Sequence, residues 1–479
     1  MPPRQSSRLK KAVAVTAASV STPTNGTSKT KVANLKVELK STEEESIKDI
    51  KDDAPIDTED RKSSKKRKAE KIEDEEDEED DQDEKDKKDG PVAEKPKAKA
   101  AKKQKTTKEK TEDLMALATR TVVSTLKKSM YIGAHVSSAG GVHNSINNAV
   151  HIGANAFALF LKSQRKWTNP PITKEAVDGF QSLSKQHKFE VHKHCLPHGS
   201  YLVNLAQAEK EKADQAYNSF LDDLKRCESL GITLYNFHPG NTGGDSRPAA
   251  IARIAAQLNK AHKATSTVIT ILENMAGQGN VIGNTFEDLR DIIELVEDKS
   301  RVGVCIDTCH AFAAGYDLRS PEAFEETVSK FNSIVGAKYL KAFHMNDSKA
   351  PFDSRRDLHA NIGTGFLGLR AFHNIMNHAG FQDMPMVLET PIDRKRPDGK
   401  TVEDKQVWAD EIKLLESLIG MDPDGDEFRA LDERLQAQGA AERNRVQDQV
   451  DRKSAKDGKK AAPKKRGKKK AAASDEDSE

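Results

Sequence analysis

The fold is indicated by a stretch in the middle of the chain that reads Val302-Gly303-Val304-Cys305-Ile306-Asp307, with Thr308-Cys309-His310 directly after it. The stretch is short, apolar and rich in β-branched residues, which is typical of a buried β-strand. It ends at a residue that can bind a metal ion. Five other apolar stretches end in the same way, and the six end residues are His198, His238, Glu273, Asp307, His344 and Glu389.

Strand-like stretches alternate with helical patterns through the centre of the chain. We expect strands at 131–136, 156–161, 190–195, 233–237, 268–272, 302–306, 339–343 and 386–388. Eight strand–helix units predict an α/β fold, a (β/α)8 TIM barrel. A doubly wound open sheet is the alternative, but it usually has fewer strands and a glycine-rich phosphate turn, for which Gly140-Gly141 is a weak match. Strand ends converge on one face of a barrel, so the six end residues would face a common centre.

Composition predicts one folded domain between two charged tails. No aromatic residue precedes Tyr131, and all fourteen histidines lie between His135 and His378. The net charge of +2 conceals an acidic block at 73–84 and lysine-rich blocks at 95–110 and 453–470. Such blocks repel themselves and remain solvated. We therefore expect a disordered extension over 1–128, a barrel domain over 129–421 and a mostly disordered tail over 422–479.

Two basic clusters, at 65–68 and 463–470, are typical of nuclear import or of contact with nucleic acid, so we expect a nuclear protein. The first acidic residue is Glu38, which keeps a mitochondrial presequence open. The chain has four cysteines and shows neither a secretory signal nor a transmembrane run, which favours a reducing compartment and no membrane partner. Cys305 and Cys309 are predicted to be buried apolar residues on one face of a strand rather than metal ligands.

Three further donors lie in loops on the same predicted face, namely His310, Asp357 and His359. Nine nitrogen and oxygen donors exceed the four of one tetrahedral zinc and predict a cluster of two or three ions. Imidazoles and carboxylates without thiolates favour zinc, with manganese or iron as alternatives. His135 ends the first strand and could line the site. The remaining histidines are interpreted as structural.

Several separated motifs resemble signatures of the endonuclease IV family of apurinic/apyrimidinic (AP) endonucleases. They are Tyr131-Ile132-Gly133-Ala134-His135, Gln164-Arg165-Lys166-Trp167, Leu196-Pro197-His198, Asn236-Phe237-His238-Pro239-Gly240, Asp307-Thr308-Cys309-His310 and His344-Met345-Asn346-Asp347-Ser348. The resemblance covers about 130–418, and the charged tails resemble those of a fungal member. It implies a monomeric TIM-barrel enzyme that cleaves double-stranded DNA 5′ to abasic sites during base excision repair. The expected products are a 3′-hydroxyl and a 5′-deoxyribose phosphate, and blocked 3′ ends would also be trimmed.

The resemblance also implies roles for individual residues. His198, His238 and Glu273 would hold a first zinc ion, which Glu273 would bridge to a second ion held by Asp307, His344 and Glu389. His310, Asp357 and His359 would hold a third. Glu273 would be the most important catalytic residue. Arg165, Tyr201 and Leu202 occupy positions that enter the duplex at the lesion, although Arg165 could be a plain phosphate contact and the other two could be ordinary loop packing.

Two other functions remain open from the sequence. A barrel sugar isomerase also gathers carboxylates and histidines around divalent ions, but it would have no use for the third donor set. A chromatin or nucleic-acid scaffold would account for the tails but not for the donors. Metal analysis distinguishes the three functions. The endonuclease requires about three zinc ions per chain, the isomerase one or two ions of the magnesium or manganese type, and the scaffold none.

Overall fold

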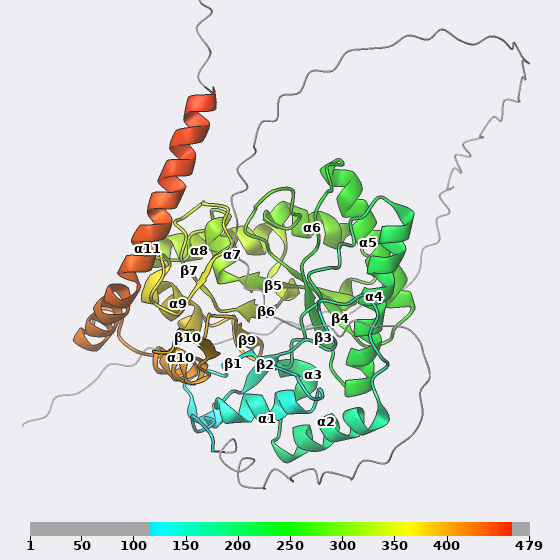
Figure 1. Cartoon of the computed structure of the whole chain (residues 1–479), viewed down its shortest axis with the longest axis horizontal. Helices are drawn as coiled ribbons and strands as arrows, with labels where there is room; N and C mark the ends of the chain where they lie inside the picture. Colours follow the sequence, from blue (N-terminus) through cyan, green and yellow to red (C-terminus); the bar gives the residue numbers. More distant parts are fainter. Residues whose placement is uncertain (1–114, 462–479) are drawn as a thin grey trace, which may run out of the picture. The chain divides into compact units, whose positions relative to one another are not determined.

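The structure is a computed structural model and describes residues 115–461 of the 479. Seven parallel strands form its central sheet in the order β2-β1-β9-β6-β5-β4-β3 (Figure 1). These strands are β1 (Tyr131–His135), β2 (Ala156–Ala158), β3 (Leu234–Phe237), β4 (Ile269–Glu273), β5 (Val302–Asp307), β6 (Leu340–His344) and β9 (Pro385–Leu388). The predicted basic clusters and the candidate presequence lie outside the described residues.

An eighth segment joins β2 to β3 and closes the sheet. The backbone N–H of Leu196 in this segment donates to the carbonyl of Phe157 in β2 (2.9 Å). The N–H of Asn236 in β3 donates to the carbonyl of Pro197 in this segment (2.9 Å). Isolated parallel bridges pair the same segment with both strands. The predicted (β/α)8 barrel is therefore confirmed.

The third predicted strand, 190–195, is wrong in position. A one-turn helix, α3 (Val191–His194), occupies most of it, and strand-like pairing begins at Cys195. The His194 ring stacks on Tyr131 at the start of β1, with ring centroids 3.4 Å apart. Pro197 has no N–H to donate, so the closing segment forms too few ladder bonds for a regular strand.

Apolar residues fill two layers. The barrel interior holds one small or medium side chain from each of seven of its segments: Ala158, Leu196, Leu234, Ile271, Cys305, Ala342 and Val387. A larger core lies between the strands and the surrounding helices. Cys305 is thus buried in the interior as predicted. Cys309 is buried too, but it lies on a short helix after β5 and not on the strand.

Eight helices follow the eight barrel segments. They are α1 (Asn144–His151), α2 (Lys174–Gln186), α4 (Lys210–Leu230), α5 (Arg247–Lys263), α6 (Phe286–Leu295), α8 (Pro321–Ile334), α9 (Gly368–Asn377) and α10 (Gln406–Ser417). Four of them start at a hydroxyl side chain that accepts a backbone N–H of the first turn: Thr173, Ser246, Thr285 and Ser320. Such caps satisfy donors that a helix leaves free.

Short elements project from the strand ends. The helix after β5 is α7 (Thr308–Ala313). Strands β7 (Asp347–Ser348) and β8 (His359–Ala360) form one antiparallel pair, and β10 (Asp393–Lys395) and β11 (Thr401–Glu403) form another.

The predicted start of the domain at 129 is wrong, because residues from 117 onward contact the barrel domain. The Arg120 Nε atom donates to Asn155 Oδ1 (2.8 Å), and its guanidinium lies 3.9 Å from the centroid of the Phe189 ring. Thr121 Oγ1 donates to Glu416 Oε2 of α10 (2.7 Å). Residues 115–128 contain no aromatic side chain, so the prediction from composition assigned them to the disordered extension.

The prediction of a mostly disordered tail is wrong for 426–461, where the structure has one long helix, α11 (Asp426–Ala461). Its first half lies beside α9 (Figure 1). The side chains of Phe428, Leu435 and Val446 are buried. Phe428, Leu431 and Leu435 recur at helical spacing, a stripe that the charged composition around them hides. None of the helices between residues 115 and 461 has the length and apolar character needed to cross a membrane.

Candidate metal centre

The nine predicted donors gather at the carboxyl ends of the barrel strands. Glu273, Asp307 and His344 are the last residues of β4, β5 and β6, and Glu389 directly follows β9. His198 ends the closing segment. The barrel therefore delivers these side chains to one mouth, as the sequence predicted.

The first predicted donor group is compact. His198 Nε2 lies 3.2 Å from Glu273 Oε2, and His238 Nε2 lies 3.6 Å from the same oxygen. The side chains of His198 and Glu273 are buried, whereas 25% of the His238 side chain is exposed. One donor of this group is therefore open to the mouth.

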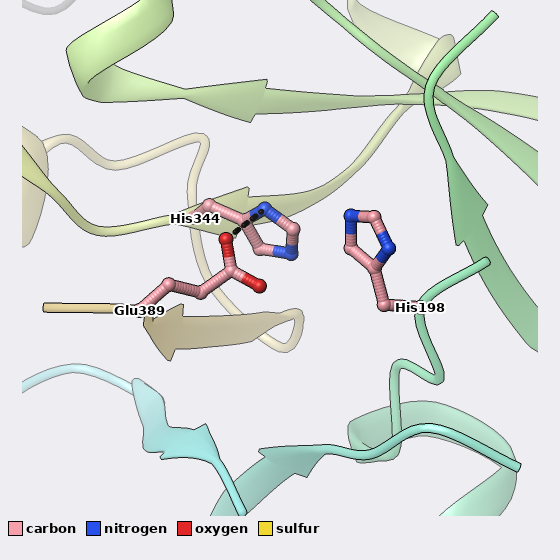
Figure 2. Close-up of side chains that lie close together, drawn as sticks. All are labelled: His198, His344 and Glu389. Carbon is pink, nitrogen blue, oxygen red and sulfur yellow. Dashed lines mark ion pairs between the residues drawn. The ribbon is translucent and has the colours of Figure 1, made fainter. Parts of the chain in front are cut away.

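The second group uses the other oxygen of the same carboxylate. His344 Nδ1 lies 3.0 Å from Glu273 Oε1, 3.4 Å from Glu389 Oε2 and 4.0 Å from Asp307 Oδ2. Figure 2 shows Glu389 reaching toward the His344 ring, with the His198 ring facing it from the opposite side. The two oxygens of Glu273 thus point into two adjacent donor groups, which is the geometry of a bridging carboxylate.

The third group is centred on Asp357, in the loop between β7 and β8. Its Oδ2 atom lies 3.0 Å from His310 Nε2, and its Oδ1 atom lies 3.2 Å from His359 Nε2. Donor atoms of Asp307 and Cys309 also lie within 4.8 Å of members of this group. The structure therefore brings His310, Asp357 and His359 together and adds a buried thiol beside them.

Backbone contacts orient three of the imidazoles. The Nδ1 atoms of His198, His310 and His359 lie within hydrogen-bond distance of the carbonyls of Gly199 (2.7 Å), Asn274 (2.9 Å) and Glu389 (3.2 Å). A proton on Nδ1 leaves Nε2 as the free lone pair that a metal needs. Within residues 115–461, the buried Nε2 atoms of His310 and His359 make no hydrogen bond. Both face Asp357, so these donors fit a metal ion.

The concentration of buried carboxylates requires positive charge. Burial alone would raise the pKa of the Glu273 carboxyl, yet the imidazoles of His344 and His238 hold that pKa well below its usual value. Burial likewise favours neutral His344, but Glu273 and Glu389 raise its pKa to about 10. In the same way Asp357 and Asp307 raise the pKa of His359 to about 9 against the effect of burial. Protons on these imidazoles compete with metal ions for the same lone pairs.

Three buried asparagines next to the donors were missed by the sequence analysis. Asn236 Nδ2 donates to Glu273 Oε2 (2.6 Å), and Asn274 Nδ2 donates to the carbonyl of Asp307 (3.3 Å). Asn346 joins two donors, because its Nδ2 atom donates to Asp307 Oδ2 (2.6 Å) and its Oδ1 atom accepts the N–H of Glu389 (2.9 Å). Each asparagine stands one or two residues from a donor in sequence, which is the signal that could have found them.

His135 also contacts the donor set, as the sequence left open. Its Nδ1 atom lies 2.9 Å from Glu389 Oε1, so His135 orients that carboxylate from the end of β1. Other histidines have structural partners, as predicted: His262 Nε2 lies 3.0 Å from Thr270 Oγ1, and His373 Nε2 lies 2.9 Å from the carbonyl of Met421.

The three predicted DNA-contacting residues are all on the surface. Tyr201 is 62% exposed and Leu202 is 39% exposed. The Tyr201 ring lies 5.4 Å from the His198 ring and 5.6 Å from the His238 ring, measured between centroids. Arg165 is exposed in the loop after β2. Tyr201 and Leu202 therefore rise directly beside the first donor group.

Comparison with known proteins identifies the family. The model of the family described as "Xylose isomerase-like TIM barrel", AP_endonuc_2, matches residues 146–418. Apurinic-apyrimidinic endonuclease 1 of Saccharomyces cerevisiae is 48% identical over 286 residues, which are 60% of this chain and 75% of the yeast protein. The probable endonuclease 4 of Campylobacter curvus is 47% identical over 289 residues, 60% of this chain and 98% of the bacterial protein. The chain belongs to the endonuclease IV family.

A solved structure of this family agrees with the fold. Endonuclease IV from Thermus thermophilus matches with a TM-score of 0.51 and 28% sequence identity, over 60% of this chain and 99% of that one. Endonuclease IV enzymes depend on metal ions, and the donor groups of this chain are consistent with that dependence.

Asn346→Ala should weaken metal retention. The substitution removes one side chain that orients both Asp307 and Glu389, and loss of such a partner costs about 10–100-fold in metal affinity. Metal content after dialysis against a buffered chelator measures the effect. Asn332→Ala, at an exposed position on α8, is the matched control. Equal metal retention in the two variants would contradict the orienting role.

Proposed function

We propose that this chain is a zinc-dependent AP endonuclease of base excision repair, which hydrolyses the phosphodiester bond 5′ to abasic sites in double-stranded DNA. The products are a 3′-hydroxyl and a 5′-deoxyribose phosphate. The observation that carries the proposal is the carboxylate of Glu273, whose two oxygens face two adjacent donor groups at the barrel mouth. The AP endonuclease and endonuclease 4 relatives support the choice of substrate.

The donor groups would hold three zinc ions. His198, His238 and Glu273 would hold the first, Glu273, Asp307, His344 and Glu389 the second, and His310, Asp357 and His359 the third. Zinc supplies Lewis acidity for an anionic phosphodiester and brings the pKa of a coordinated water down to about 7. Glu273 fixes the spacing of the first two groups and supplies negative charge to both. Asn346 and His135 hold the neighbouring carboxylates in the orientation that the centre requires.

DNA must present the abasic sugar at the mouth of the barrel, which a regular duplex does not do. Tyr201 and Leu202 are exposed beside the first donor group, which supports the proposal that they enter the duplex there. Arg165, on the neighbouring loop, supplies a positive charge for a phosphate or for the gap at the lesion.

Two finer properties are part of the proposal. A blocked 3′ end presents a similar phosphodiester or phosphate ester to the same centre, so we include 3′-end trimming. All nine donors come from one chain, so we propose that the enzyme acts as a monomer.

The rival functions are less well supported. A sugar isomerase would leave His310, Asp357 and His359 without a purpose, although these side chains converge on one another. A scaffold without catalysis would leave the buried charges of Glu273 and Asp307 unexplained, because burying a carboxylate is costly without compensation. A content of about three zinc ions per chain, together with incision of a duplex that carries one abasic site, tests the proposal directly.

For localisation, we propose the nucleus, with mitochondria as a second site. The basic clusters at 65–68 and 463–470 support nuclear import. Deletion of both clusters should lower nuclear accumulation of a fluorescently tagged chain. Unchanged accumulation would remove the import proposal, and mitochondrial signal that is lost with residues 1–37 would support the second site.

Glu273→Gln should abolish incision. The variant keeps the shape of the side chain but removes the negative charge that both donor groups share. We expect single-turnover incision to fall by about a thousandfold or more, as for loss of a preorganised electrostatic group, while lesion binding persists.

Glu294→Gln is the control for that variant. Glu294 is exposed in the last turn of α6 and belongs to no donor group, so the same chemical change there leaves the centre intact. We expect near wild-type incision for this control. Wild-type incision by Glu273→Gln would exclude a centre built around Glu273.

The double variant Tyr201→Ala/Leu202→Ala should bind abasic DNA about 10–100-fold more weakly, since stacking and wedge contacts each contribute a few kcal/mol at most. Its metal content should stay at the wild-type level, because neither side chain belongs to a donor group. Leu295→Ala is the control. Leu295 is 51% exposed and is the last residue of α6, at the end of the barrel opposite to the donor groups. A double variant that lost metal or unfolded would indicate loop packing instead.

A further inference from the structure

Two of the nine donors differ from the others in their support. Asp357 and His359 come from the loop after β7 and from β8, a two-residue strand. The other seven lie at the end of a barrel segment or in the first turn after one. Their side chains are 31% and 21% exposed. The loop before them has two non-glycine residues in the left-handed region, Asp353 and Arg355, both with φ of 54°. Such a conformation persists only when the surroundings hold it.

The helix α11 lies against the segment that follows His359. Gln436 Nε2 donates to the carbonyls of Gly363 (2.8 Å) and Gly365 (3.0 Å). Arg443 donates to the carbonyl between them, that of Thr364. Two side chains of one helix thus satisfy three consecutive backbone carbonyls of the donor-bearing segment.

The same helix also reaches the chain before Asp357. Arg356 donates to Gln449 Oε1 (3.3 Å). Contacts from α11 therefore lie on both sides of the Asp357–His359 pair, at Arg356 and at residues 363–365.

Gly439 shows that the contact is close. A Cβ atom at this position would lie 1.8 Å from the carbonyl oxygen of Thr364. Glycine inside a helix is otherwise unfavourable, because it loses more backbone entropy than alanine. Residues 436, 439 and 443 share one face of the helix, and at position 439 that face fits the segment only when the residue is glycine.

The family model ends at residue 418, whereas α11 begins at Asp426. The part of the chain that matches the family model therefore does not include α11. We propose that α11 is a positioning element for the third donor group: it holds Asp357 and His359 in place and so slows loss of the metal ion bound there. The inference rests on the proposed function, because it requires a third ion.

Gly439→Ala in the full-length chain tests the inference. Alanine favours the helix itself, so α11 should stay helical by circular dichroism but lose its close contact with Thr364. Gln436→Ala is the second variant and removes two hydrogen bonds without adding bulk. Gln438→Ala, at an exposed position two residues further along the same helix, is the matched control.

Two measurements report on the donor-bearing segment directly. We expect one of three zinc ions to be released about ten times faster or more to a chromogenic chelator, the size of effect seen when a supporting partner is removed. We expect faster hydrogen exchange over residues 349–366 in both variants. Excess zinc should restore incision in both, which a damaged barrel would not allow.

Unchanged release of all zinc ions in both variants would overturn the inference, as would a wild-type chain that holds only two. Faster release of every ion in equal measure would also overturn it, since that result means general destabilisation. Incision by the wild-type chain is measured separately. A protein that retains three ions but does not cut abasic DNA contradicts the proposed function, while its zinc release still decides the role of α11.

Discussion

The burial of the Glu273 carboxylate is the constraint on which the centre depends. Its side chain is fully buried at the end of β4, and each oxygen faces a different imidazole cluster. A buried carboxylate is tolerated only when positive charge or hydrogen bonds compensate it. His198, His238 and His344 surround it, and Asn236 adds a hydrogen bond. The convergence of strand ends in a barrel is what lets one carboxylate meet so many partners.

Much of this centre could be predicted from the sequence, for a physical reason. Strand ends such as Ile306-Asp307 and Phe343-His344 combine a local apolar pattern with a donor at a fixed position, and parallel strands in a barrel bring such positions together. Asp357 and His359 lie in the loop after the seventh predicted strand, so the sequence placed them on this face, but only the resemblance assigned them to a third ion together with His310. The structure shows why: a loop and a two-residue strand carry them, and neither has a periodic signal.

The errors of prediction also have physical causes. The segment 190–195 has only Val191 and Cys195 as apolar residues, and the pairing partners of β2 and β3 are Cys195 and His198, displaced toward the carboxyl end. The ends of the domain were misplaced because composition is averaged over long windows. Arg120 and Phe428 each contact the folded core, yet a long window averages Arg120 with the charged block that precedes it and Phe428 with the charged residues around it. A few anchoring contacts are enough to order a polar segment when a barrel surface is already present to receive them.

The side chains of the site divide between two kinds of support, and the division suits the proposed chemistry. Glu273, Asp307 and His344 lie on strands, are fully buried, and cannot move without disturbing the barrel. Tyr201 lies in a loop after the closing segment, where Gly199 approaches so closely that an added Cβ would lie 2.9 Å from the Tyr235 hydroxyl and 3.0 Å from Phe237 Cβ. This close contact lets the loop turn outward directly after His198. The barrel thus keeps the charges that must remain fixed in its interior. The side chains that we propose to meet DNA lie on loops, which would adjust to a distorted duplex at little cost to the centre.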